Sequence, residues 1–272
     1  MGRSMFGITA ALALAIALTA PASAGEKLTM DGSTGMIPLV SELAKAYQRK
    51  QPGVEIGFGK GIESIGGIRS TIEGKIDAGL VSRPLKPEEK GAGLKEVEIA
   101  RVGTVFAAHA ENPIAGITEQ QACDIYTGKV KNWKEVGGPD LAILPLSRPP
   151  QEADPTVIRD KIACFKELRE AEGVLVLLKS GDMSNALASR AGTIGMTNTT
   201  ALGALKGKVK ALALGGVAPT QENVGKGTYP LIRRFFIVTK GNPSPTIARF
   251  LEFVRSADGA KVVTELNAVP VK

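Results

Sequence analysis

The chain has 272 residues, of which 43% are hydrophobic and 22% charged, a composition that suits a globular protein with one or two cores. Its formal net charge of +7 comes from basic residues that are spread along the chain, so the sequence predicts no nucleic-acid partner. A single histidine and two separated cysteines exclude a zinc or iron cluster, and we expect neither a metal site nor a cofactor.

The first 24 residues have the features of a secretory signal peptide. Arg3 supplies a short positive region, residues 5–20 are apolar, and Ala22-Ser23-Ala24 forms a cleavage pattern. The alternative, a retained membrane anchor, needs about 20 consecutive apolar residues, more than this run contains. We therefore expect the segment to be removed and the mature protein to be periplasmic.

Strand-like and helix-like segments alternate along the mature chain, which favours an α/β architecture. In the first half, Val40, Leu43 and Tyr47 fall on one face of a helix that follows the turn at 31–35. Strands are expected at 28–30, 54–58, 78–81 and 102–108, a glycine-rich turn at 59–67 and a helix at 68–73.

The second half continues this alternation. Thr118 is expected to cap a helix that reaches Tyr126, because its hydroxyl can accept from free backbone N–H groups. Asp154 as N-cap and Pro155 as first helical residue predict the start of another helix. Strands are expected at 141–146, 193–196, 209–214 and 235–239, helices at 182–190, 244–255 and 258–266, and a loop at 215–227.

Three strand-to-helix turns, at 32–35, 59–67 and 82–85, carry small or hydroxylic residues. A helix N-terminus offers unpaired N–H groups and a positive dipole end, so it can hold an anion without a full counter-charge. Serine and threonine add donors, and glycine lets the backbone approach a ligand. Each turn alone is equally consistent with ordinary helix capping. Their recurrence predicts an oxyanion site where the helix starts converge.

Several motifs are similar to those of the phosphate-binding proteins that serve ABC importers, and they occur in the family's order. They are DGSTG (31–35), DAGLVSRPL (77–85), DIYTGKVKNW (124–133), GVAPTQENV (216–224), GTYPL (227–231) and the stretch from TKG (239–241) to the end.

The resemblance implies an α/β fold of the periplasmic-binding-protein type II class, with two lobes, two crossover segments and an inter-lobe cleft that binds the ligand. It implies that lobe 1 comprises 25–107 plus 232–272 and that lobe 2 comprises 108–231. Hinges are then expected near 107–113 and between 197 and 234.

Matching the family's ligand-binding turns residue by residue identifies a candidate site. The matching residues are Ser33, Thr34 and Gly35 in the first turn, Ser64 in the second, Ser82 and Arg83 in the third, and Arg148 in the fourth. Two family features are missing: an aspartate that accepts the proton of hydrogen phosphate, and the Gly-Ser-Gly-Thr of the fourth turn. That turn here reads Gln151-Glu152-Ala153-Asp154, and we hypothesise that Glu152 replaces the missing acceptor while Asp154 caps its helix.

Two arginines of the candidate site and the two cysteines of the chain have two interpretations each. The forked guanidinium groups of Arg83 and Arg148 suit phosphate-like oxygens, but either could instead form an inter-lobe salt bridge, with Glu152 as one partner. Cys123 and Cys164 form a disulfide if the protein is exported, and are otherwise two buried thiols.

The sequence therefore predicts an exported, monomeric solute-binding protein, not an enzyme, that captures phosphate or a similar oxyanion and delivers it to the membrane permease of an ABC importer. The alternative is a divergent member that binds another small anion, such as molybdate or sulfate, or acts as a sensor or scaffold. A secreted hydrolase is less well supported, because the lone His109 lies in a predicted strand without a nearby nucleophile elbow.

Overall fold

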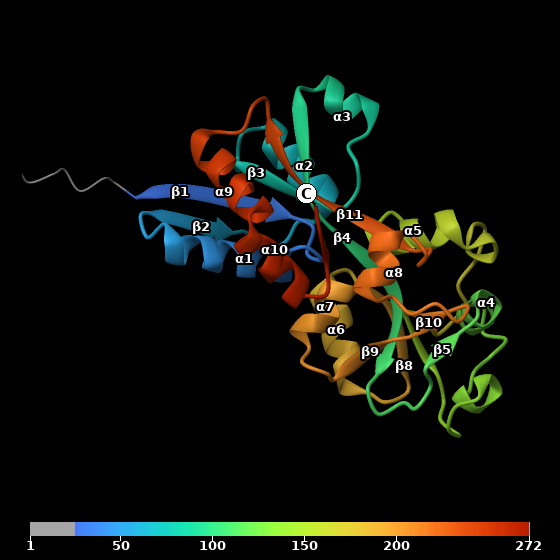
Figure 1. The fold of residues 1–272 in the computed structure, drawn as a ribbon. Coiled ribbons are helices and arrows are strands. Elements are labelled where there is room, and N and C mark those ends of the chain that lie inside the picture. The colour runs from blue at the N-terminus through green and yellow to red at the C-terminus, as the bar shows by residue number, and fades with distance from the viewer. Residues whose placement is uncertain (1–24, 272) are drawn as a thin grey trace, which may run out of the picture.

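The computed structural model describes residues 25–271, so the expected signal peptide lies outside the described part of the chain. The strands pair in the order β2-β1-β3-β11-β4-β8-β6-β7, with β12 and β9 attached to β4, and helices cover the faces. Figure 1 shows the blue start and the red end of the chain together in one lobe, and the green-to-orange middle in the other. No helix within residues 25–271 is both long and apolar enough to cross a membrane.

Lobe 1 contains both ends of the described chain (Figure 1). Three parallel strands, β1 (Glu26–Gly32), β2 (Val54–Phe58) and β3 (Ala78–Val81), are extended by β11 (Ile232–Lys240), which runs antiparallel to β3. Parallel neighbours end at the same edge, so the turns after β1 and β3 lie close together. The helices of this lobe are α1 (Ile37–Lys50), α2 (Glu63–Ile72), α3 (Pro87–Gly91), α9 (Pro245–Arg255) and α10 (Ala257–Glu265).

The long strand β4 (Leu94–His109) connects the two lobes. Its first part pairs with β11 and with β12 (Val269–Pro270), whereas from Thr104 onward it pairs with β8 (Thr193–Asn198). The chain returns just before β11, where the carbonyl of Leu231 accepts a 2.7 Å hydrogen bond from the Thr104 amide. The two crossings therefore run side by side.

Lobe 2 is built from the middle of the chain. In it, β6 (Leu144–Ser147) lies parallel to both β8 and β7 (Leu175–Val176). The remaining strands are β5 (Gly116–Ile117), β9 (Val209–Ala211) and β10 (Ala213–Leu214). The helices are α4 (Glu119–Tyr126), η1 (Trp133–Val136), α5 (Ala153–Lys161), η2 (Ala163–Phe165), α6 (Ser180–Ser189), α7 (Thr199–Ala204) and α8 (Gln221–Lys226).

Each lobe has its own hydrophobic core. In lobe 1, Tyr47 packs against Phe250, with ring centroids 5.4 Å apart. In lobe 2, Phe106, Tyr126 and Phe165 form a buried aromatic cluster.

Along β4, Val102 is buried in the core of lobe 1 and Val105 in the core of lobe 2. On the return, Leu231 is buried in the core of lobe 2 and Phe235 in that of lobe 1. We therefore propose that the lobe boundary lies at these two crossings.

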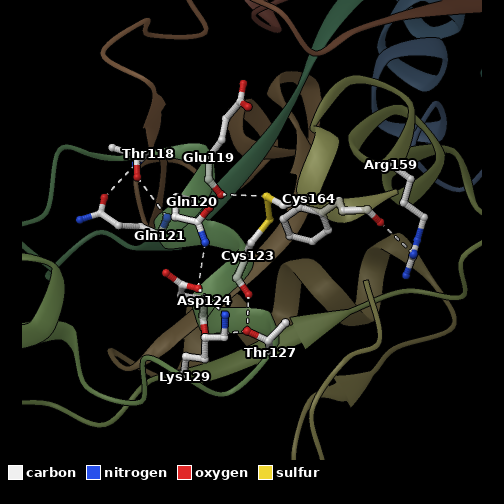
Figure 2. The surroundings of a disulfide bond; sticks show 11 residues. Thr118, Glu119, Gln120, Gln121, Cys123, Asp124, Thr127, Lys129, Arg159 and Cys164 are labelled. Carbon is white, nitrogen blue, oxygen red and sulfur yellow. Dashed lines mark hydrogen bonds and ion pairs between the residues drawn. A yellow bond between two sulfur atoms is a disulfide. The ribbon is translucent and has the colours of Figure 1, made fainter. Parts of the chain in front are cut away.

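Figure 2 shows a disulfide between Cys123 on α4 and Cys164 in η2. Thr118 caps α4 as expected, accepting from the amide of Gln121. Arg159 of α5 donates to the backbone carbonyls of Phe165 and Leu168, which holds the chain that follows α5 close to that helix. The disulfide thus joins two segments that come from opposite sides of β6 in sequence.

Expectations for three segments are wrong, besides the start of α5. The glycine-rich turn expected at 59–67 is shorter, because α2 already begins at Glu63. The segment 215–227 is not a continuous loop, because Thr220 caps the short helix α8 and Gly227 ends it in the left-handed conformation. The helix shows no apolar periodicity, since Val224 is its one buried residue, so pattern analysis passed over it. The stretch 209–214 forms two strands rather than one, β9 and β10, which pair with different partners.

Candidate functional site

Among the described α-helices that are longer than the five-residue α3, four begin without a side-chain cap: α1, α2, α5 and α6. In contrast, α4, α7, α8, α9 and α10 each begin with a Ser, Thr or Asn side chain that accepts from the first turn. An uncapped start leaves backbone N–H groups without partners and keeps the positive end of the helix dipole available. These four helix starts are therefore candidates for holding an anion.

The four uncapped starts meet where lobe 1 faces lobe 2. Thr34, just before α1, donates from Oγ1 to Glu63 Oε1 of α2 at 2.5 Å and accepts from the amide of Ser180 of α6 at 3.2 Å. Arg148 Nη2 donates to the same Glu63 oxygen at 3.1 Å and lies 3.5 Å from Glu152 Oε2 at the start of α5. The structure thus brings helix starts from both lobes to one place.

Three serine hydroxyls from lobe 1 form a cluster at this place. Ser82 Oγ lies 3.0 Å from Ser33 Oγ and 3.2 Å from Ser64 Oγ. They meet because β1 and β3 end at the same edge and because α2 packs closely on both strands. That packing requires Gly67, since a Cβ atom there would lie 2.9 Å from the Cα of Gly32.

A cavity of about 60 Å³ lies between the start of α2, the end of β3 and the start of α5. It is lined by Glu63, Ser64, Ile65, Ser82, Arg83, Gln151, Glu152, Ala153, Thr156 and Val157. A larger cavity of about 380 Å³ is bounded by Thr34 and Gly35 in lobe 1 and by the start of α6 in lobe 2. The space between the lobes therefore continues on the α6 side of the site.

Arg148 follows β6 directly and its side chain is 2% exposed. Besides Glu63 and Glu152, it lies 4.0 Å from Asp154 Oδ2, and it donates to Ser180 Oγ and to the carbonyl of Leu178. A buried guanidinium needs compensating charge and hydrogen bonds, and Arg148 obtains both from groups of the two lobes. In this structure Arg148 therefore forms an ion pair with Glu63 of the other lobe and a second with Glu152 of its own lobe.

Asp154 does not cap α5, contrary to expectation. The helix begins at Ala153, two residues before the expected Pro155, and Asp154 forms a buried 2.7 Å ion pair with Arg233 of β11 instead. Burial lowers the pKa of the Arg233 guanidinium, which Asp154 partly offsets. The Nε and Nη2 groups of Arg233 are buried without a partner in the described residues.

Arg83 lines the smaller cavity, but its guanidinium is held by Glu89 through bonds of 2.8 and 2.7 Å. The pKa of Arg83 is raised chiefly by this bidentate hydrogen bonding to Glu89. Its positive charge at the cavity is therefore largely compensated within lobe 1.

Glu152 lies at the cavity beside Glu63, and its pKa is raised to about 7. Burial is the main cause and the neighbouring Glu63 carboxylate the next, while Arg148 acts in the opposite direction. The protonated form of this carboxyl is therefore favoured relative to that of an ordinary glutamate. With two buried arginines beside three carboxyl groups, the site suits an anion that brings hydrogen-bond donors of its own.

Gly35 lies close to polar side chains from other elements. A Cβ atom on Gly35 would lie 2.9 Å from Nη2 of Arg233, which is in the same lobe, and 3.1 Å from Nδ2 of Asn198 at the end of β8. A side chain at this position would have to displace these polar groups.

Of the eight predicted site residues, seven lie where the four helix starts meet between the lobes. The eighth, Arg83, directs its guanidinium to Glu89. The sequence analysis missed Ser180 and Arg233. Ser180-Gly181 has the same small and hydroxylic character as the other turns and could have been found by that signal. Arg233 lies within a strand and gives no local signal. Among residues 25–271, no group of three or more His, Cys, Asp or Glu side chains could hold a metal ion.

Comparison with known proteins places these features in a wider context. Residues 19–258 match a family model described as a PBP superfamily domain. The chain is 32% identical to the phosphate-binding protein PstS of Bacillus subtilis, an alignment that covers 91% of this chain and 82% of that protein. It is 26% identical to PstS of Borreliella burgdorferi, with 90% of each protein covered.

A solved structure shows the same fold. It is a putative phosphate ABC transporter substrate-binding protein from Clostridium perfringens with bound phosphate, which is 32% identical to this chain. The superposition has a TM-score of 0.80 and covers 91% of this chain and 100% of the other. The expected two-lobed type II fold is therefore confirmed.

Proposed function

Because this chain belongs to the phosphate-binding protein family of the PBP superfamily, we propose that it is an exported solute-binding protein for phosphate or a similar oxyanion. It captures the anion in the cleft between its lobes, acts as a monomer in the periplasm, and delivers the anion to the permease of an ABC importer. In this role it binds its solute reversibly and carries out no chemical reaction.

The observation that carries this proposal is the meeting of four uncapped helix starts with a serine cluster and a buried arginine. Backbone N–H groups at helix starts are donors that an anion can satisfy, and they cost no additional buried charge. In the proposed complex, Ser33, Ser64 and Ser82 donate from hydroxyls, Thr34 donates from its hydroxyl and its backbone amide, and Gly35 donates from the backbone. Arg148 supplies the formal positive charge.

The carboxylates of the fourth turn favour a protonated solute. A carboxylate 4 Å from a bound anion repels it by about 4 kcal/mol at an effective dielectric near 20. The repulsion is relieved when the solute donates a proton to the carboxylate in a hydrogen bond. Hydrogen phosphate and hydrogen arsenate can do so, whereas sulfate near neutral pH cannot. We assign this acceptor role to Glu152, and Arg83 lines the rim.

Capture requires that the lobes separate and close again. We place the hinges at the adjacent crossings in β4 and before β11, because each is a single strand between two independent cores. Since Thr34, Glu63, Arg148 and Ser180 form contacts between the lobes, closure and anion binding involve the same residues.

Calorimetry of the ligand-free mature protein with phosphate, arsenate, sulfate and molybdate tests the proposal. Phosphate and arsenate should bind, and above pH 7, where Glu152 is ionised, sulfate should bind about 100-fold more weakly because Glu152 would lack a donor. Ser64→Ala should weaken phosphate binding about 10-fold, whereas Ser70→Ala, farther along α2, should leave it unchanged. Absence of phosphate and arsenate binding would contradict the proposal, and turnover of a phosphate ester would favour the hydrolase.

One observation favours a second candidate, a divergent member that binds a different small anion or acts as a sensor. The start of α5 presents Glu152 and Asp154 where the resemblance leads one to expect hydroxyl donors. Tighter binding of sulfate or molybdate than of phosphate in the same titrations would support this candidate.

A further inference from the structure

Glu63, the first residue of α2, has an unusual backbone conformation. Its φ of 58° lies in the left-handed region, which side chains with a Cβ atom disfavour. Its neighbour Gly61 also has a positive φ, but glycine adopts this region without strain. A strained non-glycine residue persists where the surrounding contacts hold it, and such residues cluster at functional sites.

The side chain of Glu63 accepts hydrogen bonds from two residues that are candidates for binding the solute. Its Oε1 atom accepts from Thr34 Oγ1 at 2.5 Å and from Arg148 Nη2 at 3.1 Å. Thr34 Oγ1 in turn accepts from the amide of Ser180 at 3.2 Å. One carboxylate oxygen thus connects the start of α1 in lobe 1 to the end of β6 and the start of α6 in lobe 2.

The same donors are needed by a bound oxyanion. Arg148 is the positive group that the proposed function assigns to the solute, and Thr34 belongs to the first binding turn. A solute anion beside Glu63 would meet a like charge at close range, in addition to Glu152 and Asp154, which already lie 3.5 and 4.0 Å from Arg148. The Glu63 carboxylate and the solute therefore compete for Arg148 and Thr34.

We propose that Glu63 is a resident carboxylate ligand of the oxyanion site, which holds Arg148 and Thr34 together across the lobes until the solute displaces it. This inference rests on the proposed function. In the ligand-free protein, Glu63 stabilises the closed arrangement, and on binding, the anion takes over its donors. Glu63 thereby lowers the affinity for the solute and sets the concentration at which the protein becomes loaded.

Calorimetry and small-angle scattering of Glu63→Gln test this inference. The amide preserves the size of the side chain but removes the charge that competes with the solute, so the Kd for phosphate should fall about 10-fold. Without the ion pair to Arg148, the ligand-free variant should scatter as a more open particle than the wild type. Glu73→Gln is the matched control, because Glu73 follows the other end of α2 and pairs only with the exposed Lys75.

A second variant keeps the test valid if Glu63→Gln fails to fold. Glu63→Gly accepts the positive φ without strain and also lacks the carboxylate, so it should show the same gain in affinity and the same opening. An unchanged or higher Kd for phosphate in both variants, or ligand-free scattering equal to that of the wild type, would overturn the inference.

Failure of this inference can be distinguished from failure of the proposed function. If neither the wild type nor the variants bind phosphate or arsenate, the proposed function is wrong. The scattering of the ligand-free proteins still shows whether Glu63 closes the lobes, and an unchanged profile would then reject its role as well.

Discussion

The side chain of Arg148 determines how the site is charged, because it is buried and lies beside three carboxyl groups from α2 and α5. Removing Arg148 would leave these carboxyl groups buried without the guanidinium that compensates them, which is costly. Of the three carboxyl groups, Glu152 alone lines the cavity with a pKa raised to about 7. The protonation state of the site near neutral pH therefore depends on this residue.

Glu152 should make stability depend on pH. From its ordinary value of 4.5 up to about 7, the folded protein retains a proton that the unfolded chain has lost. The free energy of unfolding therefore falls as pH rises through this window and is constant above it as far as Glu152 is concerned. Glu152→Gln should flatten the fall and be more stable than the wild type above pH 7 by about 1 kcal/mol, allowing for solvent screening.

Urea unfolding of the wild type and Glu152→Gln across this pH range measures the effect. Glu55→Gln, an exposed residue that pairs with Lys27, serves as the control and should follow the wild type. A wild-type stability that rises from pH 5 to 7 by an amount that Glu152→Gln removes would contradict the assigned direction of the shift.

At the scale of whole elements, helix starts divide into two kinds. Capped helices such as α4 satisfy their first N–H groups with a side chain and need nothing further. The uncapped helices α1, α2, α5 and α6 all point their starts at the contact between the lobes. The elements away from the site are stabilised locally instead, and the disulfide between α4 and η2 is one example.

Removing the disulfide should lower stability without altering solute binding. The bond closes a loop of 41 residues, and the loss of chain entropy in the unfolded state corresponds to about 4 kcal/mol. The double variant Cys123→Ala/Cys164→Ala should therefore unfold at a lower urea concentration and bind phosphate with unchanged affinity. Treatment of the wild type with a reductant gives an independent comparison. Equal stability of the oxidised protein and the double variant would contradict the expectation.

At the scale of the whole molecule, two independent cores are connected by adjacent strands, and polar groups of both lobes meet between them. A solute that binds both lobes stabilises their closed arrangement, and it stabilises the folded state over the unfolded chain in proportion to its affinity.

Phosphate should therefore raise the melting temperature. At 100 times its Kd, a ligand that binds only the folded state adds about 2.7 kcal/mol, which corresponds to about 5–10 °C for a domain of this size. Thermal unfolding with phosphate should show this shift, and an equal concentration of sulfate should give a much smaller one. No shift at saturating phosphate would mean that the anion does not bind the folded protein at this site.

Local sequence features alone determined a large part of this protein. Thr118, Ser244 and the alternating apolar residues of β2 act within a few neighbouring residues, so the helix starts and strands they specify could be predicted. The motifs around Ser33 and Ser82 likewise led to the family and to most of the site. Short elements such as α8 were missed because they bury too few residues to produce a periodic pattern.

Only the tertiary structure decided the charge of the site. Arg148 and Glu63 are 85 positions apart in sequence, and Arg233 and Asp154 are 79 apart, so no local pattern pairs them. Asp154 had the sequence features of a helix cap and became the partner of a buried arginine, because an unpaired buried charge is far more costly than a missing cap. Local geometry thus follows from neighbouring residues, whereas the pairing of buried charges depends on how the two lobes come together.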